Sequence, residues 1–300
     1  MTELLQVFEE FRMQPTVNDQ YTELGRPKLI EKMSPFVSAY KPIKFSMLGY
    51  PMKSPNDRDK VLGKLPDLGE QVSIENFARF AALMKDVYRP GVEFSIISDG
   101  FIFADIMQVN DRIVEQYEER VKDMSERAKA PITWYDMTSF FPRGMSMLTM
   151  REKIMEQFGI TSEILEQRIL MDPDVNSLYR GMIYFMNGDL AIREYPSRSQ
   201  LQKHSKIVAR EMMFRNEAYS RMIQHEFADH IRLSMHQSVN NGTKYSFQLI
   251  PGPKAKHSPW HSALLINKDG TLETIHKAEA FERKAELVDK DGQPYYFQEV

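Results

Sequence analysis

Residues 49–70 read GYPMKSPNDRDKVLGKLPDLGE and constrain the fold more than any other part of the chain. The segment holds three prolines and three glycines, which interrupt any helix and leave no strand pattern. A loop of this length within a patterned chain is typically functional or disordered. Its apolar residues favour packing over disorder; they are Tyr50, Met52, Val61, Leu62, Leu65 and Leu68. We therefore expect an ordered, functional loop.

The composition is typical of a soluble chain. Its 300 residues are 42% hydrophobic, enough for one large α/β domain or two small ones, and its formal net charge of -3 offers no footprint for nucleic acid. The absence of cysteine excludes disulfides, thiolate catalysis and cysteine-bound zinc. The start MTELLQVFEEFRMQP lacks the features of a signal peptide, and no apolar run approaches the roughly 20 residues of a membrane span. We expect a cytoplasmic protein without membrane contact.

Alternating helical and strand-like segments favour an α/β architecture after about residue 70. A helix is predicted to begin at Ser73 and to end before Pro90-Gly91. The run VEFSII at 92–97 then reads as a buried strand, and a helix capped near Asn110 follows. Residues 132–137 form a second candidate strand, which gives a repeated order of strand, loop and helix.

The last third of the chain changes from helical to strand-like patterns. Residues 150–227 are mostly helical by pattern, with a candidate strand at GMIYFM, and four strands follow at HIRLSMH, KYSFQLI, HSALLIN and TLETIH. Asn241-Gly242 and Asp269-Gly270 predict hairpins between the first pair and the last pair. We expect one α/β domain with a mixed sheet flanked by helices and with C-terminal antiparallel hairpins.

The common cofactor signatures are missing from the sequence. There is no G-x-G-x-x-G after a strand and no phosphate-binding G-x-x-x-x-G-K-[ST]. His225 and His230 are five residues apart, which places the two imidazoles roughly 140° apart on a helix. The sequence therefore predicts no metal site there.

Polar residues at the predicted strand 231–236 suggest an anion site. Alternation puts Arg232, Ser234 and His236 on one face, and Lys244 begins the next predicted strand. A guanidinium offers a bidentate fork and an ammonium a point charge, so the group suits a phosphate or carboxylate. The alternative is the solvent-facing side of an antiparallel sheet.

Two further candidates lie in loops. Asp99 follows the strand 92–97, where α/β sheets place ligands, and could orient an amine or take a proton. Lys53 in the loop at residues 49–70, which we call the opening loop, could bind an anionic substrate. An ordinary Asp-Gly turn and a solvated lysine are the respective alternatives.

Four segments, taken in order, resemble the pyoverdine/dityrosine biosynthesis family, the isonitrile synthases. They are PMKSPNDRDKVLGKLPDLGE at 51–70, SDGFIFADIMQVND at 98–111, the IRLSMH strand with Lys244, and SPWH at 258–261. The resemblance implies a family core over 45–280, preceded by a helical extension at 1–44 and followed by a tail at 281–300. It also implies a Rossmann-like fold without the dinucleotide fingerprint.

The resemblance implies a specific reaction. Members join the amino group of an amino acid, typically tyrosine or tryptophan, to ribulose 5-phosphate and leave it as an isonitrile, whose carbon is the keto carbon of the sugar. No metal or redox cofactor is implied. An iron/2-oxoglutarate oxygenase acting downstream is implied as a pathway partner, and a fungal branch is associated with N-formyl-tyrosine instead. The sequence carries no signal for an oligomeric state.

This chemistry assigns a role to each polar group. Lys53, Arg232, Ser234, His236 and Lys244 are the predicted phosphate or carboxylate ligands. The predicted acid–base residues are Asp99, Glu70 and His261, with Asp67 and Asp105 as secondary candidates, and Trp260 could stack on an aromatic substrate. Replacing Lys53 by Ala is expected to abolish turnover with little effect on stability.

Two other functions are consistent with the residues. One is a sugar-phosphate aldolase or isomerase that forms a Schiff base on Lys53 or Lys244. The other is a binding module on the same fold without catalytic activity.

Overall fold

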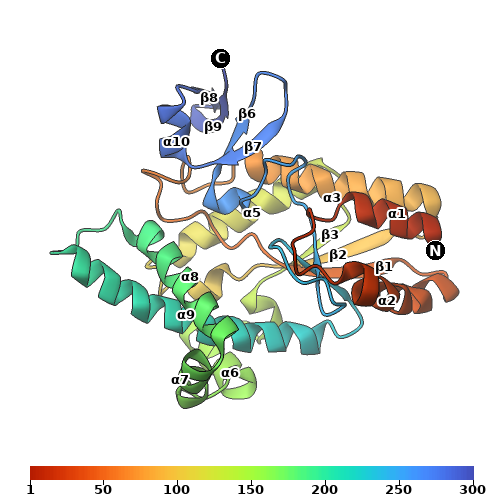
Figure 1. Cartoon of the computed structure of the whole chain (residues 1–300), viewed down its shortest axis with the longest axis horizontal. Helices are drawn as coiled ribbons and strands as arrows, with labels where there is room; N and C mark the ends of the chain where they lie inside the picture. Colours follow the sequence, from red (N-terminus) through yellow and green to blue (C-terminus); the bar gives the residue numbers. More distant parts are fainter.

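The computed structural model describes all residues from 1 to 300 and divides the strands between two sheets (Figure 1). The main sheet has five strands, all parallel, in the order β3-β2-β1-β4-β5. Its strands are β1 (Ile43–Leu48), β2 (Val92–Ile97), β3 (Ile132–Tyr135), β4 (Ile231–Ser234) and β5 (Tyr245–Ser246). Most residues of β1 and β2 are buried on both faces, as in central strands of parallel sheets.

Helices cover both faces of the main sheet. On one side α3 and α5 pack together with α1 against α3, while α2 and the long α9 lie on the other side (Figure 1). The helices are α1 (Thr2–Glu10), α2 (Arg26–Ser38), α3 (Leu68–Val87), α4 (Gly100–Phe103), α5 (Asp111–Arg127), α6 (Met147–Phe158), α7 (Ser162–Met171), α8 (Pro173–Leu190), α9 (Arg198–Glu226) and α10 (Lys277–Glu282), with short turns η1 (Tyr21–Gly25), η2 (Met137–Phe140) and η3 (Pro259–His261). No helix is both long and apolar enough to cross a bilayer.

The second sheet forms a small C-terminal lobe, residues 263–298, at the top of Figure 1. Its strand order is β7-β6-β9-β8, and α10 lies within the same lobe. The strands are β6 (Ala263–Ile266), β7 (Leu272–Ile275), β8 (Glu286–Lys290) and β9 (Gln293–Gln298). The lobe contacts the opening loop, because Leu62 is buried in its apolar cluster.

The main apolar core includes the N-terminal helix. Phe45 of β1 stacks on Phe94 of β2 with 5.7 Å between ring centroids, and Phe8 of α1 stacks on Phe45 at 6.0 Å. Leu4 and Leu5 are buried in the same cluster. The predicted helical extension at the N-terminus is thus integrated into the core.

The predicted fold class is confirmed by this arrangement. Helices flank a parallel sheet, the strand 92–97 is β2, and Asn110 caps α5 by accepting a hydrogen bond from the Arg112 amide. The predicted hairpin at Asp269-Gly270 joins β6 and β7, and Gly270 has the positive φ of 79° that such turns need.

Three predicted elements are wrong. β4 and β5 pair in parallel, because the connection at 235–244 runs back to the end of the sheet at which β4 begins, and Asn241-Gly242 is only a bend within it. The segment GMIYFM lies inside α8, since a short apolar run does not distinguish strand from helix. α3 begins at Leu68 instead of Ser73, because Asp67 and Glu70 form a capping box that the sequence reading overlooked.

Candidate active site

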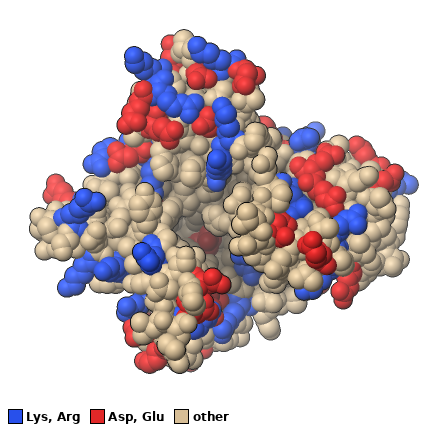
Figure 2. Space-filling model, in the orientation of Figure 1, with Lys and Arg blue, Asp and Glu red and all other residues tan.

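The order of the strands places a switch point at β1. From β1 the sheet continues through β2 to β3 on one side and through β4 to β5 on the other. Ligands of such sheets bind beyond the carboxyl ends of the strands at the switch point. Figure 2 shows a hollow near the centre of the molecule in this view, below the C-terminal lobe, with acidic atoms visible at its bottom. We call five polar groups around these strands the edge site; they are Asp99 after β2, Arg232 within β4, His236 after β4, Lys244 before β5 and His261 in η3.

The loops at this edge pack closely against one another. A Cβ atom on Gly100 would lie 2.1 Å from the Pro51 carbonyl oxygen, so the turn after β2 contacts the loop after β1 backbone to backbone. A Cβ atom on Gly49 would lie 3.2 Å from the Trp260 ring and 3.8 Å from the Met235 sulfur. The segments after β1 and β4 and the turn η3 therefore meet at one place.

Arg232 and Lys244 are cations whose pKa values are not shifted by any carboxylate, and the same holds for the imidazole of His236. Desolvation by the surrounding protein lowers the pKa of the half-buried Arg232. Lys244 and His236 keep exposed surface; partial desolvation and the charge of Arg232 lower the pKa of Lys244, and partial desolvation and the charge of Lys244 lower the pKa of His236. The partners of the Arg232 guanidinium are the hydroxyl and carbonyl of Ser220 on α9, at 3.1 and 3.5 Å. A bound anion would relieve the repulsion among these cations.

Ser234 shapes the backbone beside these cations. Its hydroxyl donates to the His236 carbonyl at 3.0 Å and accepts from the His236 amide at 3.3 Å. The hydroxyl of Ser234 therefore makes both of these hydrogen bonds with the backbone of His236, and we assign Ser234 a structural role.

Asp99 stands at the carboxyl end of β2 with an unused oxygen. Its Oδ1 is buried without a hydrogen-bond partner, and its side chain does not cap α4. Burial raises the pKa of Asp99 to about 6. Above that pH it can accept a hydrogen bond from a cationic donor.

His261 lies in η3 between the cations and α8. Burial lowers its pKa to about 4; the charge of Asp189 opposes this shift, whereas Lys60, His236 and Lys53 reinforce it. The imidazole is therefore neutral at neutral pH and carries a free lone pair. Its Nδ1 is buried without a partner.

Lys53 does not reach the edge site as a free cation. Its ammonium contacts Asp67 Oδ2 at 2.7 Å, Glu70 Oε2 at 2.8 Å and the Pro259 carbonyl at 2.9 Å, and so its three hydrogens are used. Burial opposes the charge of Lys53, but the two carboxylates outweigh it and raise its pKa. Burial raises the pKa of Asp67 to about 7. We call Lys53, Asp67 and Glu70 the buried triad.

All three members of the buried triad make structural contacts. Glu70 accepts a hydrogen bond from Tyr117 at 3.0 Å and is fully buried. Asp67 accepts from the Gly69 amide at 2.9 Å as the cap of α3. Asp-x-x-Glu before a helix was the available signal for these structural roles.

Two other predicted site residues also lie elsewhere. Asp105 forms ion pairs with Arg215 at 2.6 Å and with Arg151 at 3.6 Å, which fasten the end of α4 to α9 and α6. Trp260 is 1% exposed and packs on Tyr50 with 4.9 Å between ring centroids, so it cannot stack on a substrate in this structure.

Sequence reasoning missed Glu118 and Tyr219. Glu118 is 4% exposed, its Oε1 has no partner, and burial raises its pKa to about 7. Tyr219 donates to the Ser98 carbonyl at 2.9 Å. Glu118 was detectable, because it falls between Val114 and Val121 on the apolar face of α5; Tyr219 gave no such signal.

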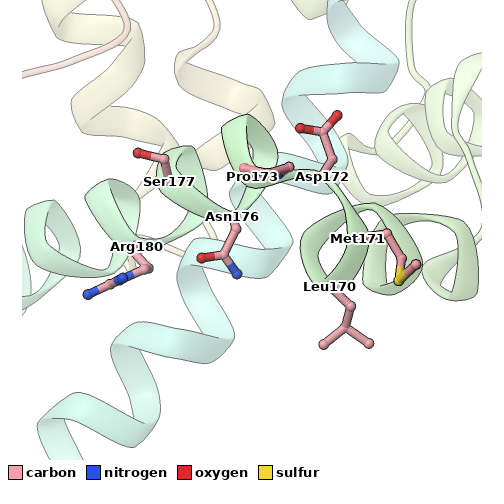
Figure 3. Close-up of a pocket in the computed structure, with 7 residues that line it drawn as sticks. All are labelled: Leu170, Met171, Asp172, Pro173, Asn176, Ser177 and Arg180. Carbon is pink, nitrogen blue, oxygen red and sulfur yellow. The ribbon is translucent and has the colours of Figure 1, made fainter.

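A second hollow lies at the corner between α7 and α8 (Figure 3). Asp172 there accepts from the Asp174 and Val175 amides as the cap of α8, and Arg180 points away from it. Charged groups do not converge in this hollow, unlike in the edge site. No group of three or more potential metal ligands lies together in the structure.

Comparisons with known proteins place the chain among a defined set of relatives. The family model described as pyoverdine/dityrosine biosynthesis protein matches residues 33–288. The chain is 33% identical over 296 residues to the isocyanide synthase xanB of Aspergillus fumigatus, covering 91% of this chain and 38% of that protein. It is 30% identical over 271 residues to the L-tryptophan isonitrile synthase AmbI2 of Fischerella ambigua, covering 89% and 81%.

A solved structure shares the fold. The crystal structure of the PvcA protein from Pseudomonas aeruginosa superposes with a TM-score of 0.89, covering 100% of this chain and 99% of that chain. The two sequences are 23% identical over this match, so it shows the arrangement of the chain and no more.

Replacing Lys53 with Met is expected to lower the free energy of unfolding by about 3–5 kcal/mol, because two buried carboxyl groups lose their cation. This replaces the earlier expectation of unchanged stability. Urea denaturation measures the effect. Lys64→Met is the control, since Lys64 is exposed without an ion pair and should change stability by less than about 0.5 kcal/mol. Equal denaturation midpoints for both variants would contradict the role of the buried triad.

Proposed function

The chain belongs to the pyoverdine/dityrosine biosynthesis family, and on this premise we propose that it is an isonitrile synthase. In this proposal it converts the amino group of an aromatic L-amino acid, tyrosine or tryptophan, to an isonitrile, with ribulose 5-phosphate as the carbon donor. The observation that carries the proposal is the pair of cations without acidic partners, Arg232 and Lys244, with His236 close to Lys244. The unused buried oxygen of Asp99 and the neutral imidazole of His261 support it.

The cations suit the phosphate of the sugar. A phosphate monoester is largely dianionic at neutral pH and can accept a bidentate hydrogen-bond pair from Arg232 and a single bond from Lys244. Its charge would also favour protonation of His236, whose pKa is lowered by partial desolvation and by Lys244. The phosphate would fix the sugar with its keto carbon over the switch point.

Asp99 and His261 suit the chemistry at the amine. The ionised Asp99 accepts a hydrogen bond from the substrate ammonium, and a base must remove one proton before nitrogen attacks the keto carbon. Loss of water then gives an imine, and the later carbon–carbon cleavages need protons removed from sugar hydroxyls. His261, neutral because burial lowers its pKa to about 4, is the base we assign to these steps.

A lysine Schiff-base enzyme is the second candidate. The fully paired ammonium of Lys53 is a poor nucleophile, but the lowered pKa of Lys244 favours it as an amine. Borohydride treatment with sugar phosphate would trap a covalent adduct on Lys244 only in this mechanism.

The direct test is mass spectrometry of the purified protein incubated with a mixture of amino acids and ribulose 5-phosphate labelled with carbon-13 at the keto carbon. The proposal predicts a product that is one amino acid plus the labelled carbon, less two hydrogens, and that does not form without the sugar. A labelled formyl product would identify the fungal type of reaction instead. No labelled amino-acid product from folded protein would refute the proposal.

Replacing Arg232 with Gln is expected to raise KM for ribulose 5-phosphate by about 10-fold to 100-fold, because a charged hydrogen bond to phosphate is lost. Steady-state kinetics measure this change. Arg221→Gln is the control, because Arg221 is exposed on α9 and pairs with Glu217. Unchanged KM in Arg232→Gln would remove this residue from the phosphate site.

The rate constant kcat/KM for the amino acid is expected to fall as pH drops below about 6, where Asp99 takes up a proton. Burial raises this pKa, so the active carboxylate form is lost at a higher pH than for an exposed aspartate. A pH–rate profile measures the effect, and the residual activity of Asp99→Asn should lack this limb. A limb retained in Asp99→Asn would assign the ionisation to another group, such as Glu118.

A further inference from the structure

Asp189, near the end of α8, has one carboxylate oxygen in use and one unused. Its Oδ1 accepts hydrogen bonds from the Lys60 ammonium and from the Ser54 hydroxyl, the latter at 2.9 Å. Its Oδ2 is buried without a partner, and the residue as a whole is 0% exposed. A buried carboxylate oxygen without a donor is costly, which indicates a functional reason for its position.

The imidazole of His261 faces the same side of α8. Its ring meets the Phe185 ring edge to face, with 4.7 Å between centroids and an interplanar angle of 89°. Phe185 and Asp189 are four residues apart and therefore lie on one face of the helix. Nδ1 of His261 is buried and unpartnered, whereas Nε2 is neither hydrogen-bonded nor sealed from solvent.

The opening loop holds both residues in place. Ser54 and Lys60 bind Asp189, and the Asn56 amide donates to the Gly188 carbonyl at 2.7 Å. The Ser54 amide donates to the Trp260 carbonyl at 2.8 Å, next to His261. The loop thus ties the end of α8 to the turn η3.

We propose that Asp189 is the positioning residue of His261: its Oδ2 accepts the Nδ1 proton, through one water or a small rotation of the ring. This fixes the proton on Nδ1 and leaves the lone pair of Nε2 facing the edge site. No direct hydrogen bond joins the two groups in this structure, but both atoms need a partner. The task of the positioned base, to take protons from the amine and sugar hydroxyls, rests on the proposed function.

The other charged groups near His261 act in the opposite sense. Lys60 from the loop, His236 from the end of β4 and Lys53 from the buried triad each disfavour a proton on the ring, whereas Asp189 favours one. Asp189 is the acidic group among them. It can therefore accept a hydrogen bond from Nδ1–H and leave Nε2 as the proton acceptor.

Asp189→Asn tests the proposal. Because Lys60 and Ser54 both donate to Oδ1, the amide oxygen should take that position and its NH₂ group the position of Oδ2. The NH₂ group would donate to Nδ1 and move the ring proton to Nε2, which is the wrong tautomer for a base. We expect kcat to fall by roughly 100-fold or more with little change in KM.

The tautomer is read directly by nitrogen-15 NMR of histidine-labelled protein. The chain has seven histidines, and the His261 signals are assigned by their loss in His261→Gln. Wild type should show the Nδ1–H tautomer and Asp189→Asn the Nε2–H tautomer. The His261 pKa should also fall in Asp189→Asn, since the charge that raises it is removed.

Asp229→Asn is the matched control. Asp229 is exposed and contacts His230 Nδ1 at 2.7 Å, so this variant should alter the His230 signals and leave His261 and kcat unchanged. An Nε2–H tautomer in wild type, or an unchanged tautomer in Asp189→Asn, would overturn the proposal. If Asp189→Asn does not fold, the wild-type tautomer decides. A tautomer change in a protein without isonitrile activity would refute the proposed function and support the positioning role.

Discussion

The buried triad is the interaction on which the rest of the structure depends. Lys53 bonds to Asp67, to Glu70 and to the Pro259 carbonyl, and so joins the loop after β1, the start of α3 and the turn η3 at one point. An ion group of this kind gains little net stability over apolar packing but admits few alternative arrangements. An irregular loop with three prolines can therefore adopt one conformation at the centre of the protein.

The structural cations form ion pairs with buried carboxylates, whereas the cations that we assign to substrate binding do not. Lys53 and Lys60 come from the loop and are neutralised by buried carboxylates, so they fix the chain. Arg232 and Lys244 come from the β4–β5 region and have no carboxylate nearby, so their repulsion is uncompensated until an anion binds. Both kinds look alike in a sequence, because pairing depends on residues far away along the chain, such as Asp189 for Lys60.

The sequence predicted the features that depend on local patterns. The strand at 92–97, the Asn110 cap and the turn at Gly270 each follow from neighbouring residues, and all three are confirmed. One error concerns pairing over a longer distance, because the direction of β5 depends on the path of the whole connection at 235–244. The start of α3 is a different error, because the capping box of Asp67 and Glu70 is present in the sequence. The burial of Trp260 depends on its contact with Tyr50, which lies far away along the chain.

The most direct test of the central claim, that the uncompensated cations bind the sugar phosphate, is a crystal structure of the protein soaked with ribulose 5-phosphate. We expect a phosphate with hydrogen bonds from Arg232 and Lys244, and a keto carbon on the side of Asp99 and His261. A phosphate bound elsewhere, for example against Lys60 and His276, or a sugar that leaves Arg232 without contact, would contradict the claim.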